Sequence, residues 1–261
     1  MCGRFTLASP RAAVKELLPL LDGPEIQPRY NIAPTQPVLA VRQLPQYARP
    51  EIVTLRWGLV PHWADDIKVG YSLINARSES AADKPAFRDA FRRRRCLILA
   101  DGFYEWQKLD GRKQPYHIHR RDGKPFAFAG LWERWNRGEQ PLETCTILTT
   151  DANDLMRPLH DRMPVMLDPG DFERWLDPTV DRPAEFQPFL KPCPEDWLQA
   201  TPVSTHVNNP RNEDASCIVP IPAQLLQSWF VHPRPAGRDL ARSCLGCQRH
   251  FISPPRSAGL R

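Results

Sequence analysis

The N-terminus carries the residue with the most distinctive chemistry. Cys2 follows Met1 directly, and methionine aminopeptidases remove an initiating methionine when the next side chain is small, as cysteine is. Removal would leave an α-amine with a pKa of about 7.7 to 8.0 beside a thiol with a pKa of about 8.5, and both are partly reactive at neutral pH. Such a 1,2-aminothiol can form a Schiff base with an aldehyde and then close a durable thiazolidine ring. A small residue at position 2 also occurs in many chains without any role, so Cys2 alone does not establish a function.

Three further side chains could move protons or hold a reacting group. Asn75 stands at a predicted strand-to-helix junction, where a helix cap or a turn hydrogen bond is the simpler role. Glu105 lies among aromatic residues at the end of a predicted strand, where burial would raise its pKa toward use as a general acid; a salt bridge is the alternative. His160 follows a polar turn, and its imidazole can exchange a proton near neutral pH or simply bond a loop carbonyl.

Other residues suit the binding of a nucleic acid strand. Arg77 and Arg162 could each fork onto a phosphate. Unpaired bases could stack on exposed aromatic faces, for which the candidates are Trp57, Trp63, Phe91 and Trp106. Most arginines and tryptophans are ordinary surface or core residues, however, and the basic run at 92–95 is most simply a solvated helix end.

These side chains must be positioned by a fold that is mostly strands. Segments rich in β-branched and aromatic residues predict strands at 38–42, 52–60, 96–106 and 144–150. Residues 116–120 and 126–131 flank the turn sequence Arg121-Asp122-Gly123-Lys124, which predicts a hairpin.

Short helices are expected beside these strands. The sequence Ser9-Pro10 predicts a capped helix over 11–18, helical spacing appears within 78–94, and Asp168-Pro169 starts a short helix that reaches Trp175. Strands and helices do not alternate regularly, so we expect an α+β fold: a single compact domain with a mainly antiparallel, barrel-like core and flanking short helices.

The composition indicates one main domain inside the cell. With 261 residues, of which 41% are hydrophobic, the chain can bury one sizeable core. No apolar run is long enough to span a bilayer, and the N-terminus lacks the layout of a secretory signal, so we expect a cytoplasmic protein. The seven cysteines are irregularly spaced, which favours reduced thiols over a disulfide framework.

The formal charge of +5 belongs to the C-terminal part of the chain. Residues 223–261 hold six arginines and one acid, which leaves 29 of the 35 basic and 29 of the 30 acidic residues in 1–222. We therefore expect a domain over 1–222 and a basic, flexible tail over 223–261, so any DNA site in the domain is a local groove. Cys244, Cys247 and His250 of the tail could form part of a zinc site, but no fourth ligand is evident and we expect no metal or other cofactor.

Several of these residues lie within motifs that occur in the same order in a known family. Over about residues 2–222 the chain resembles the SOS response-associated peptidase family, the abasic-site processing proteins. The motifs that carry the resemblance are Met1-Cys2-Gly3-Arg4-Phe5, Arg29-Tyr30-Asn31-Ile32-Ala33-Pro34, Trp57-Gly58-Leu59-Val60-Pro61, Asn75-Ala76-Arg77, residues 100–106, His160-Asp161-Arg162-Met163-Pro164 and Val207-Asn208-Asn209-Pro210. Two features depart from the family pattern: Leu99 stands where proline is frequent, and the arginine-rich tail is an extension.

The resemblance implies a compact α+β domain with a groove for single-stranded DNA. It implies that Cys2 attacks the abasic sugar, Asn75 holds the N-terminal region and the lesion, Glu105 assists proton transfer, and His160 helps to open the deoxyribose ring. It further implies that the DNA backbone is gripped by Arg77 and Arg162, with Trp63 and Pro34 as weaker candidates in the loops that bend the strand.

The expected partner is thus single-stranded DNA with abasic sites, and replication proteins are further candidates. We expect the protein to be a monomer in a bacterial cytoplasm, associated with the nucleoid when it is bound to DNA. A thiol peptidase that uses the same N-terminal nucleophile, a noncovalent DNA-binding module and a weak β-elimination lyase remain alternatives.

Overall fold

The computed structural model describes residues 2–19, 25–109 and 111–222. Their contacts form one unit that ends at Ile221. The expected tail over 223–261, with the candidate zinc ligands Cys244, Cys247 and His250, lies outside the described residues. The domain boundary at residue 222 therefore stays a prediction.

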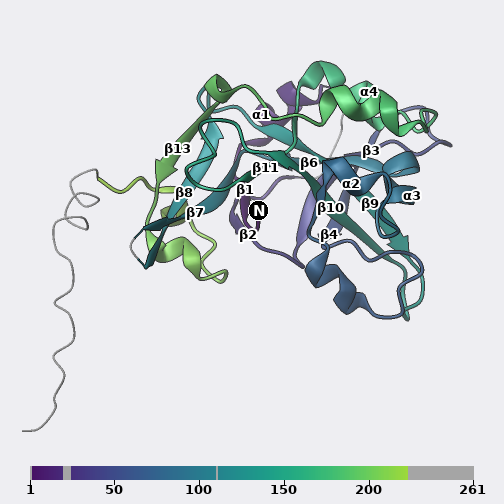
Figure 1. The fold of residues 1–261 in the computed structure, drawn as a ribbon, viewed down its shortest axis with the longest axis horizontal. Coiled ribbons are helices and arrows are strands. Elements are labelled where there is room, and N and C mark those ends of the chain that lie inside the picture. Colours follow the sequence, from purple (N-terminus) through teal and green to yellow (C-terminus); the bar gives the residue numbers. More distant parts are fainter. Residues whose placement is uncertain (1, 20–24, 110, 223–261) are drawn as a thin grey trace, which may run out of the picture. The chain divides into compact units, whose positions relative to one another are not determined.

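A closed barrel of five strands forms the centre of the fold (Figure 1). Around the barrel the order is β10, β4, β3, β6 and β9, and β9 pairs with β10 to close it. The β4–β10 pair is parallel and the other four pairs are antiparallel, so the barrel is mixed. The bounds of these strands are β3 (Pro37–Arg42), β4 (Glu51–Trp57), β6 (Arg95–Ala100), β9 (Phe126–Trp135) and β10 (Leu142–Asp151).

An antiparallel sheet of five strands stands beside the barrel. Its order is β13, β8, β7, β1 and β2, with the bounds β1 (Phe5–Leu7), β2 (Arg29–Ile32), β7 (Gly102–Leu109), β8 (Arg112–Arg120) and β13 (Leu198–Pro202). Only Asp101 separates β6 of the barrel from β7 of this sheet. The prediction of one strand over 96–106 is therefore wrong, because the chain leaves one sheet and enters the other at that residue.

Three short strands extend the barrel at β10 and β9. β5 (Asn75–Arg77) runs parallel to β10, and β11 (Arg162–Pro164) pairs with β10 in the antiparallel sense. β12 (Met166–Leu167) pairs with β9. β5 lies on the same side of β10 as β4, and β11 lies on the same side as β9. The two short strands therefore flank the C-terminal end of β10 from opposite sides.

Short helices cover the outside of the strands, as expected for this α+β fold (Figure 1). The α-helices are α1 (Arg11–Leu17), α2 (Ser78–Ala81), α3 (Arg88–Arg93) and α4 (Phe172–Leu176), and the 3-10 turns are η1 (Ile67–Ser72), η2 (Pro169–Asp171), η3 (Pro183–Phe189), η4 (Glu195–Trp197), η5 (Thr205–Asn208) and η6 (Ala215–Ile218). Among the described residues, none of these helices has the length and apolarity that crossing a bilayer would need.

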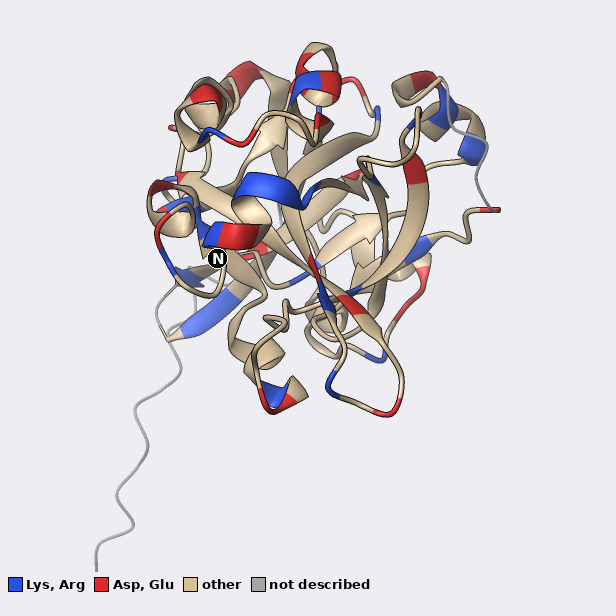
Figure 2. Cartoon of the chain, turned by 90° about the vertical axis from the view of Figure 1, so that its right-hand side faces the viewer, with Lys and Arg blue, Asp and Glu red and all other residues tan. Residues whose placement is uncertain are grey.

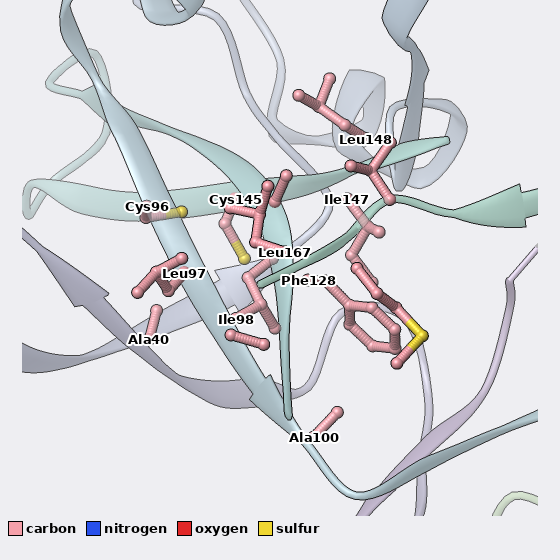
Figure 3. Close-up of a cluster of buried hydrophobic side chains, with 14 of the residues drawn as sticks. Ala40, Cys96, Leu97, Ile98, Ala100, Phe128, Cys145, Ile147, Leu148 and Leu167 are labelled. Atoms are coloured by element: carbon pink, nitrogen blue, oxygen red, sulfur yellow. The ribbon is translucent and has the colours of Figure 1, made fainter. Parts of the chain in front are cut away.

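The hydrophobic core fills the barrel and continues under the second sheet. Figure 3 shows side chains of β6, β9 and β10 packed together, among them Ile98, Phe128 and Ile147. Phe5 of β1 meets the rings of Trp57 and Phe128 edge-on, with centroids 5.1 and 5.8 Å apart. Full burial of a phenylalanine side chain stabilises a fold by about 1.5–3 kcal/mol. This contact therefore anchors β1, and with it the N-terminus, against the barrel.

Two local predictions differ from the structure. The turn around Gly123 forms, with a φ of 69°, but it does not join a hairpin: β8 pairs with β7 and β13, whereas β9 pairs with β6, β10 and β12. The hairpin prediction is wrong because a turn signal is local, while pairing is decided by distant strands. Ser9 does not cap α1 either, since Pro10 occupies the N-cap position and forms no side-chain cap bond.

Candidate active site at the N-terminus

Cys2 lies three residues before the first residue of β1, in a fully buried position. The Arg4 carbonyl accepts the Tyr104 N–H at 3.0 Å, which continues the β1–β7 pairing toward Cys2. The Cys2 thiol donates weakly to the same carbonyl, with 3.7 Å between sulfur and oxygen. Burial raises the pKa of this thiol well above its ordinary value, and the negative charge of Glu105 raises it further. The thiol is thus protonated at neutral pH.

Asn75 connects the barrel to the N-terminal residues. It belongs to β5, opposite Ile147 of β10, and its Nδ2 donates to the Cys2 carbonyl at 2.7 Å. It is not a helix cap, because Arg77 occupies the N-cap position of α2. The Asn75 Oδ1 is buried and has no hydrogen-bond partner among the described residues. Asn75 therefore holds the backbone of Cys2 and keeps an acceptor for another group.

Glu105 lies on β7 with 4% of its surface exposed. Burial raises the pKa of its carboxyl group, the charge of Asp161 adds to that rise, and the Trp106 N–H opposes it. A carboxyl group with a raised pKa can both donate and accept a proton near neutral pH. Since its charge also acts on the Cys2 thiol, the structure brings Cys2, Asn75 and Glu105 together.

His160 lies in the loop between β10 and β11, with 31% of its side chain exposed. Its Nδ1 accepts the Arg162 backbone N–H at 2.9 Å, yet the same atom is 2.7 Å from Asp161 Oδ1, a contact that needs a proton on Nδ1. Desolvation lowers the pKa of the ring, which favours its neutral form. In that form the bond from the Arg162 N–H requires the proton on Nε2, whereas a bond to Asp161 would require it on Nδ1. The charge of Asp161 acts on both His160 and Glu105, which places His160 in the same electrostatic environment as Glu105.

The two candidate arginines differ in what they can still bind. Arg77 is exposed at the end of β5. Arg162 is 9% exposed, and its guanidinium already donates to Glu79, Asp151 and the Thr149 carbonyl. Arg77 is therefore accessible to a phosphate. Arg162 Nε has no hydrogen-bond partner among the described residues but is buried, so the expected phosphate contact of Arg162 stays a prediction that requires the guanidinium to shift.

The two loop candidates lie on segments next to β4. Trp63 is 45% exposed between β4 and η1, so its indole face is open to a base. Pro34 is half-buried and precedes Thr35, whose φ of 73° lies in the left-handed region and whose N–H donates to the Trp57 carbonyl at 2.8 Å. Their roles toward DNA stay predictions.

Arg4 and Asn31 form a buried clamp that the sequence motifs contain but to which no role was assigned. Arg4 Nη1 donates to Asn31 Oδ1 at 2.7 Å and to the Val207 carbonyl at 3.1 Å. Asn31 is fully buried, and its Nδ2 donates to the carbonyls of Val207, Asn209 and Asn212. Three motifs far apart in the sequence thus meet to hold β1. The signal available in the sequence was the presence of all three motifs together.

Asp101 is a second anchor that sequence reasoning missed. Its Oδ1 accepts the Thr6 hydroxyl at 2.5 Å, and its Oδ2 accepts the backbone N–H groups of Ala8 and Ser9, both at 2.6 Å. The Ser9 hydroxyl also donates to Oδ2, at 2.9 Å. One carboxylate therefore fixes the end of β1 at the point where β6 passes into β7.

Basic and acidic residues are interspersed along the chain, as the blue and red segments of the ribbon in Figure 2 show. This agrees with the balanced composition of residues 1–222. Within the described parts of the chain, no three side chains of metal-ligating type are grouped to hold an ion. The four predicted catalytic residues offer a thiol, an amide, a carboxyl group and an imidazole.

Comparison with known proteins gives close relatives along most of the chain. The abasic site processing protein YoqW of Bacillus subtilis (strain 168) is 44% identical over 223 residues, which cover 84% of this chain and 99% of that protein. The abasic site processing protein YedK of Escherichia coli (strain K12) is 31% identical over 229 residues, which cover 85% of this chain and 100% of that protein.

Solved structures share the fold. A protein from Bacteroides thetaiotaomicron superposes with a TM-score of 0.70 at 23% identity and covers 84% of this chain and 100% of its own. A phage-related protein from Bordetella bronchiseptica gives a TM-score of 0.63 at 32% identity, covering 77% of this chain and 94% of its own. The model of the SOS response associated peptidase (SRAP) family matches residues 1–210. This chain belongs to the SRAP family.

Proposed function

We propose that the chain recognises abasic sites in single-stranded DNA and cross-links to them through Cys2 after removal of Met1. The observation that carries the proposal is the fixed N-terminus: the Cys2 carbonyl is held by Asn75 beside the buried carboxyl group of Glu105. An N-terminal amine and thiol held next to an acid suit an aldehyde, and an abasic deoxyribose supplies one when its ring opens. The relatives YoqW and YedK are both named abasic site processing proteins, which supports the same substrate.

The first step opens the sugar ring. The neutral His160 offers its Nε2–H as a hydrogen bond to the ring oxygen, since Nδ1 accepts the Arg162 N–H. The C1′ hydroxyl proton passes through water to that oxygen while the C1′–O4′ bond breaks, which leaves the C1′ aldehyde and a C4′ hydroxyl. A neutral imidazole acts here by polarising the oxygen and gives up no net proton.

The second step forms the Schiff base. The neutral Cys2 amine attacks C1′, and a proton moves from nitrogen to oxygen to give a carbinolamine. Glu105 then donates its proton to the carbinolamine hydroxyl, which leaves as water and produces an iminium ion. The raised pKa of Glu105, caused by burial, keeps a proton available for this transfer near neutral pH.

The third step closes the thiazolidine. The Cys2 sulfur adds to C1′, the iminium nitrogen takes back its electron pair, and the thiol proton goes to the Glu105 carboxylate. Burial raises the pKa of the thiol, so the carboxylate left by the previous step is the base that this step needs. Overall, one C–N and one C–S bond form to C1′ and one water is lost.

The strand is held beside the site by groups that remain accessible. Arg77 is exposed two residues after Asn75 and suits a backbone phosphate. Trp63, with 45% of its surface exposed, suits a stacked base. We propose that Pro34 shapes the neighbouring loop and that Arg162 reaches DNA only by exchanging one of its internal partners.

The family name also suggests a peptidase with the same N-terminal nucleophile. A thiol peptidase needs a thiolate, and burial opposes thiolate formation at Cys2. We therefore limit any proteolysis in this proposal to removal of Met1.

The test is intact mass measurement and a denaturing gel after mixing the full chain with a single-stranded oligonucleotide that carries one abasic site. We expect an adduct with the mass of the protein lacking Met1 plus the oligonucleotide minus one water. Cys2→Ala and Cys2→Ser should give no such stable adduct, because neither can close a thiazolidine. Cys217→Ala, which removes another fully buried thiol, should form it normally.

The alternatives predict other outcomes. Hydrolysis of a peptide substrate that persists in Cys2→Ser would favour the peptidase, and salt-sensitive binding that is unchanged in Cys2→Ala without any adduct would favour a noncovalent module. A chain that has lost Met1 and forms no adduct would refute the covalent proposal.

A further inference from the structure

We propose that Glu79 is a positioning residue that fixes His160 in its working orientation and tautomer through Arg162. The inference rests on the proposed function, in which His160 polarises the sugar ring, and it adds a residue that needs no contact with DNA. Glu79 lies two residues after the motif Asn75-Ala76-Arg77 and is the second residue of α2.

The side chain of Arg162 is almost fully engaged inside the protein. Nη1 donates to Glu79 Oε1 and to Asp151 Oδ1, each at 2.7 Å. Nη2 donates to Glu79 Oε2 at 2.8 Å and to the Thr149 carbonyl at 2.6 Å. A guanidinium has four N–H bonds on its two Nη atoms, so each of them has a partner. The pairing with Glu79 is bidentate, which fixes the plane of the guanidinium as well as its place.

This ion pair joins two segments that carry the proposed chemistry. Thr149 of β10 pairs with Arg77 of β5 on one side and with Pro164 of β11 on the other. Glu79 continues the first segment and Arg162 begins the second. The pair therefore bridges β5–α2 and β11 across the end of β10, and it ties the position of Asn75 to that of the His160 loop.

His160 receives its orientation from the backbone of the same arginine. The Arg162 N–H donates to His160 Nδ1 at 2.9 Å. While this bond is present, the neutral ring carries its proton on Nε2. Without it, Nδ1 could instead carry the proton and donate to Asp161 Oδ1, which lies 2.7 Å away. Fixing Arg162 by its side chain thus fixes the donor that selects the tautomer. The guanidinium does this from a buried position, with 11% of its side chain exposed.

A purely stabilising ion pair would behave differently. The Glu79 side chain is 51% exposed, and without it the buried Arg162 guanidinium would keep Asp151 and the Thr149 carbonyl as partners, so no buried charge is left unpaired. The hydrogen bonds from Arg162 lower the pKa of Glu79, so Glu79 is charged at neutral pH and the bridge is intact under the conditions of the reaction. Loss of Glu79 should therefore affect His160 more than it affects the folded state.

The experiment compares wild type, Glu79→Gln and the control Glu51→Gln in single-turnover cross-linking to an oligonucleotide with one abasic site. Glu51 is a matched control, because it pairs with Arg42 at 2.8 Å and Arg42 also contacts Glu143. For Glu79→Gln we expect the rate at saturating DNA to fall about tenfold, with the half-saturating DNA concentration changed less than about twofold. Glu51→Gln should leave both quantities unchanged, and thermal unfolding confirms that each variant is folded.

Nitrogen NMR of the His160 ring gives a readout that does not need the cross-link. We expect the ring of wild type to show Nε2–H with Nδ1 as acceptor, and that of Glu79→Gln to show a mixture of tautomers. A Glu79→Gln variant with wild-type rate and wild-type tautomer would overturn the inference, as would a change in half-saturation alone. A wild-type protein that forms no adduct would refute the proposed function, while the NMR comparison would still decide whether Glu79 controls His160.

Discussion

Removal of the Asp101 carboxylate should loosen the N-terminal strand in a graded way. Asp101 accepts four hydrogen bonds, from the Thr6 hydroxyl, the N–H groups of Ala8 and Ser9, and the Ser9 hydroxyl. In Asp101→Asn the amide oxygen can keep the three donors at Oδ2, while its NH₂ group faces Thr6, whose hydroxyl can turn to accept. In Asp101→Ala all four donors lose their partner.

The structure sets the expected size of both effects. A hydrogen bond to a charged group contributes about 1.5–3 kcal/mol, but Asp101 is only half-buried and its donors can be rehydrated. We therefore expect Asp101→Asn to lower the free energy of unfolding by about 1 kcal/mol and Asp101→Ala to lower it by about 3 kcal/mol. For a domain of this size about 3 kcal/mol corresponds to a fall in Tm of about 6–12 °C.

Urea unfolding of the three proteins, followed by tryptophan fluorescence, measures these differences, and cross-linking to an abasic oligonucleotide measures the consequence for Cys2. We expect the cross-linking rate to follow the order wild type, Asp101→Asn, Asp101→Ala, because Asp101 fixes the strand that places Cys2. Equal unfolding free energies for wild type and Asp101→Ala, within about 0.5 kcal/mol, would show that Asp101 is not an anchor.

Three other predictions address the same region. Glu105→Gln should slow cross-linking by about a hundredfold. The wild-type rate should fall as pH rises through the raised pKa of Glu105. A Glu105→Gln variant with the same pH profile as wild type would contradict the role of Glu105 as the proton donor. Gly102→Ala should reduce the free energy of unfolding by about 3 kcal/mol, because a Cβ there would lie 2.0 Å from His117 Nε2. The control is Gly170→Ala, whose Cβ would meet only the Asp168 carboxylate, at 3.2 Å. Equal losses of unfolding free energy in the two variants would refute the steric explanation. Desolvation lowers the pKa of His117 from 6.5 to about 3. At a pH between these two values the imidazole is protonated in the unfolded chain and neutral in the folded protein. The free energy of unfolding therefore falls as pH falls, by at most about 1.4 kcal/mol per pH unit. His117→Gln should flatten that slope in urea unfolding at several pH values, and an unchanged slope would assign it to other groups.

Much of the fold class was available from local patterns. Runs of β-branched and aromatic residues marked β3, β4 and β10, and the short helices were expected close to where they occur. These signals are local because side-chain alternation and helix breaking depend on neighbours in the sequence. The α+β fold with a barrel-like core is confirmed, although the β4–β10 pair is parallel.

Pairing between distant strands was not available from such patterns. The turn at Gly123 was recognised, but the strands on its two sides belong to different sheets. The division of 96–106 at Asp101 was also missed, because strand-forming residues stand on both sides of Asp101-Gly102 while the chain changes its hydrogen-bonding partners there. The composition of a strand indicates that it will be buried, but it does not indicate with which other strand it will pair.

The sequence by itself determined the chemical groups of the candidate site: a cysteine that becomes N-terminal when Met1 is removed, and Asn75, Glu105 and His160 within motifs typical of one family. Only the tertiary structure decided what each group contacts. In the folded chain Asn75 donates a hydrogen bond to the Cys2 carbonyl, and the guanidinium of Arg162 is paired with Glu79. The physical reason is that reactivity belongs to the residue type, whereas burial, pKa and hydrogen-bond partners arise from segments that meet only when the chain has folded.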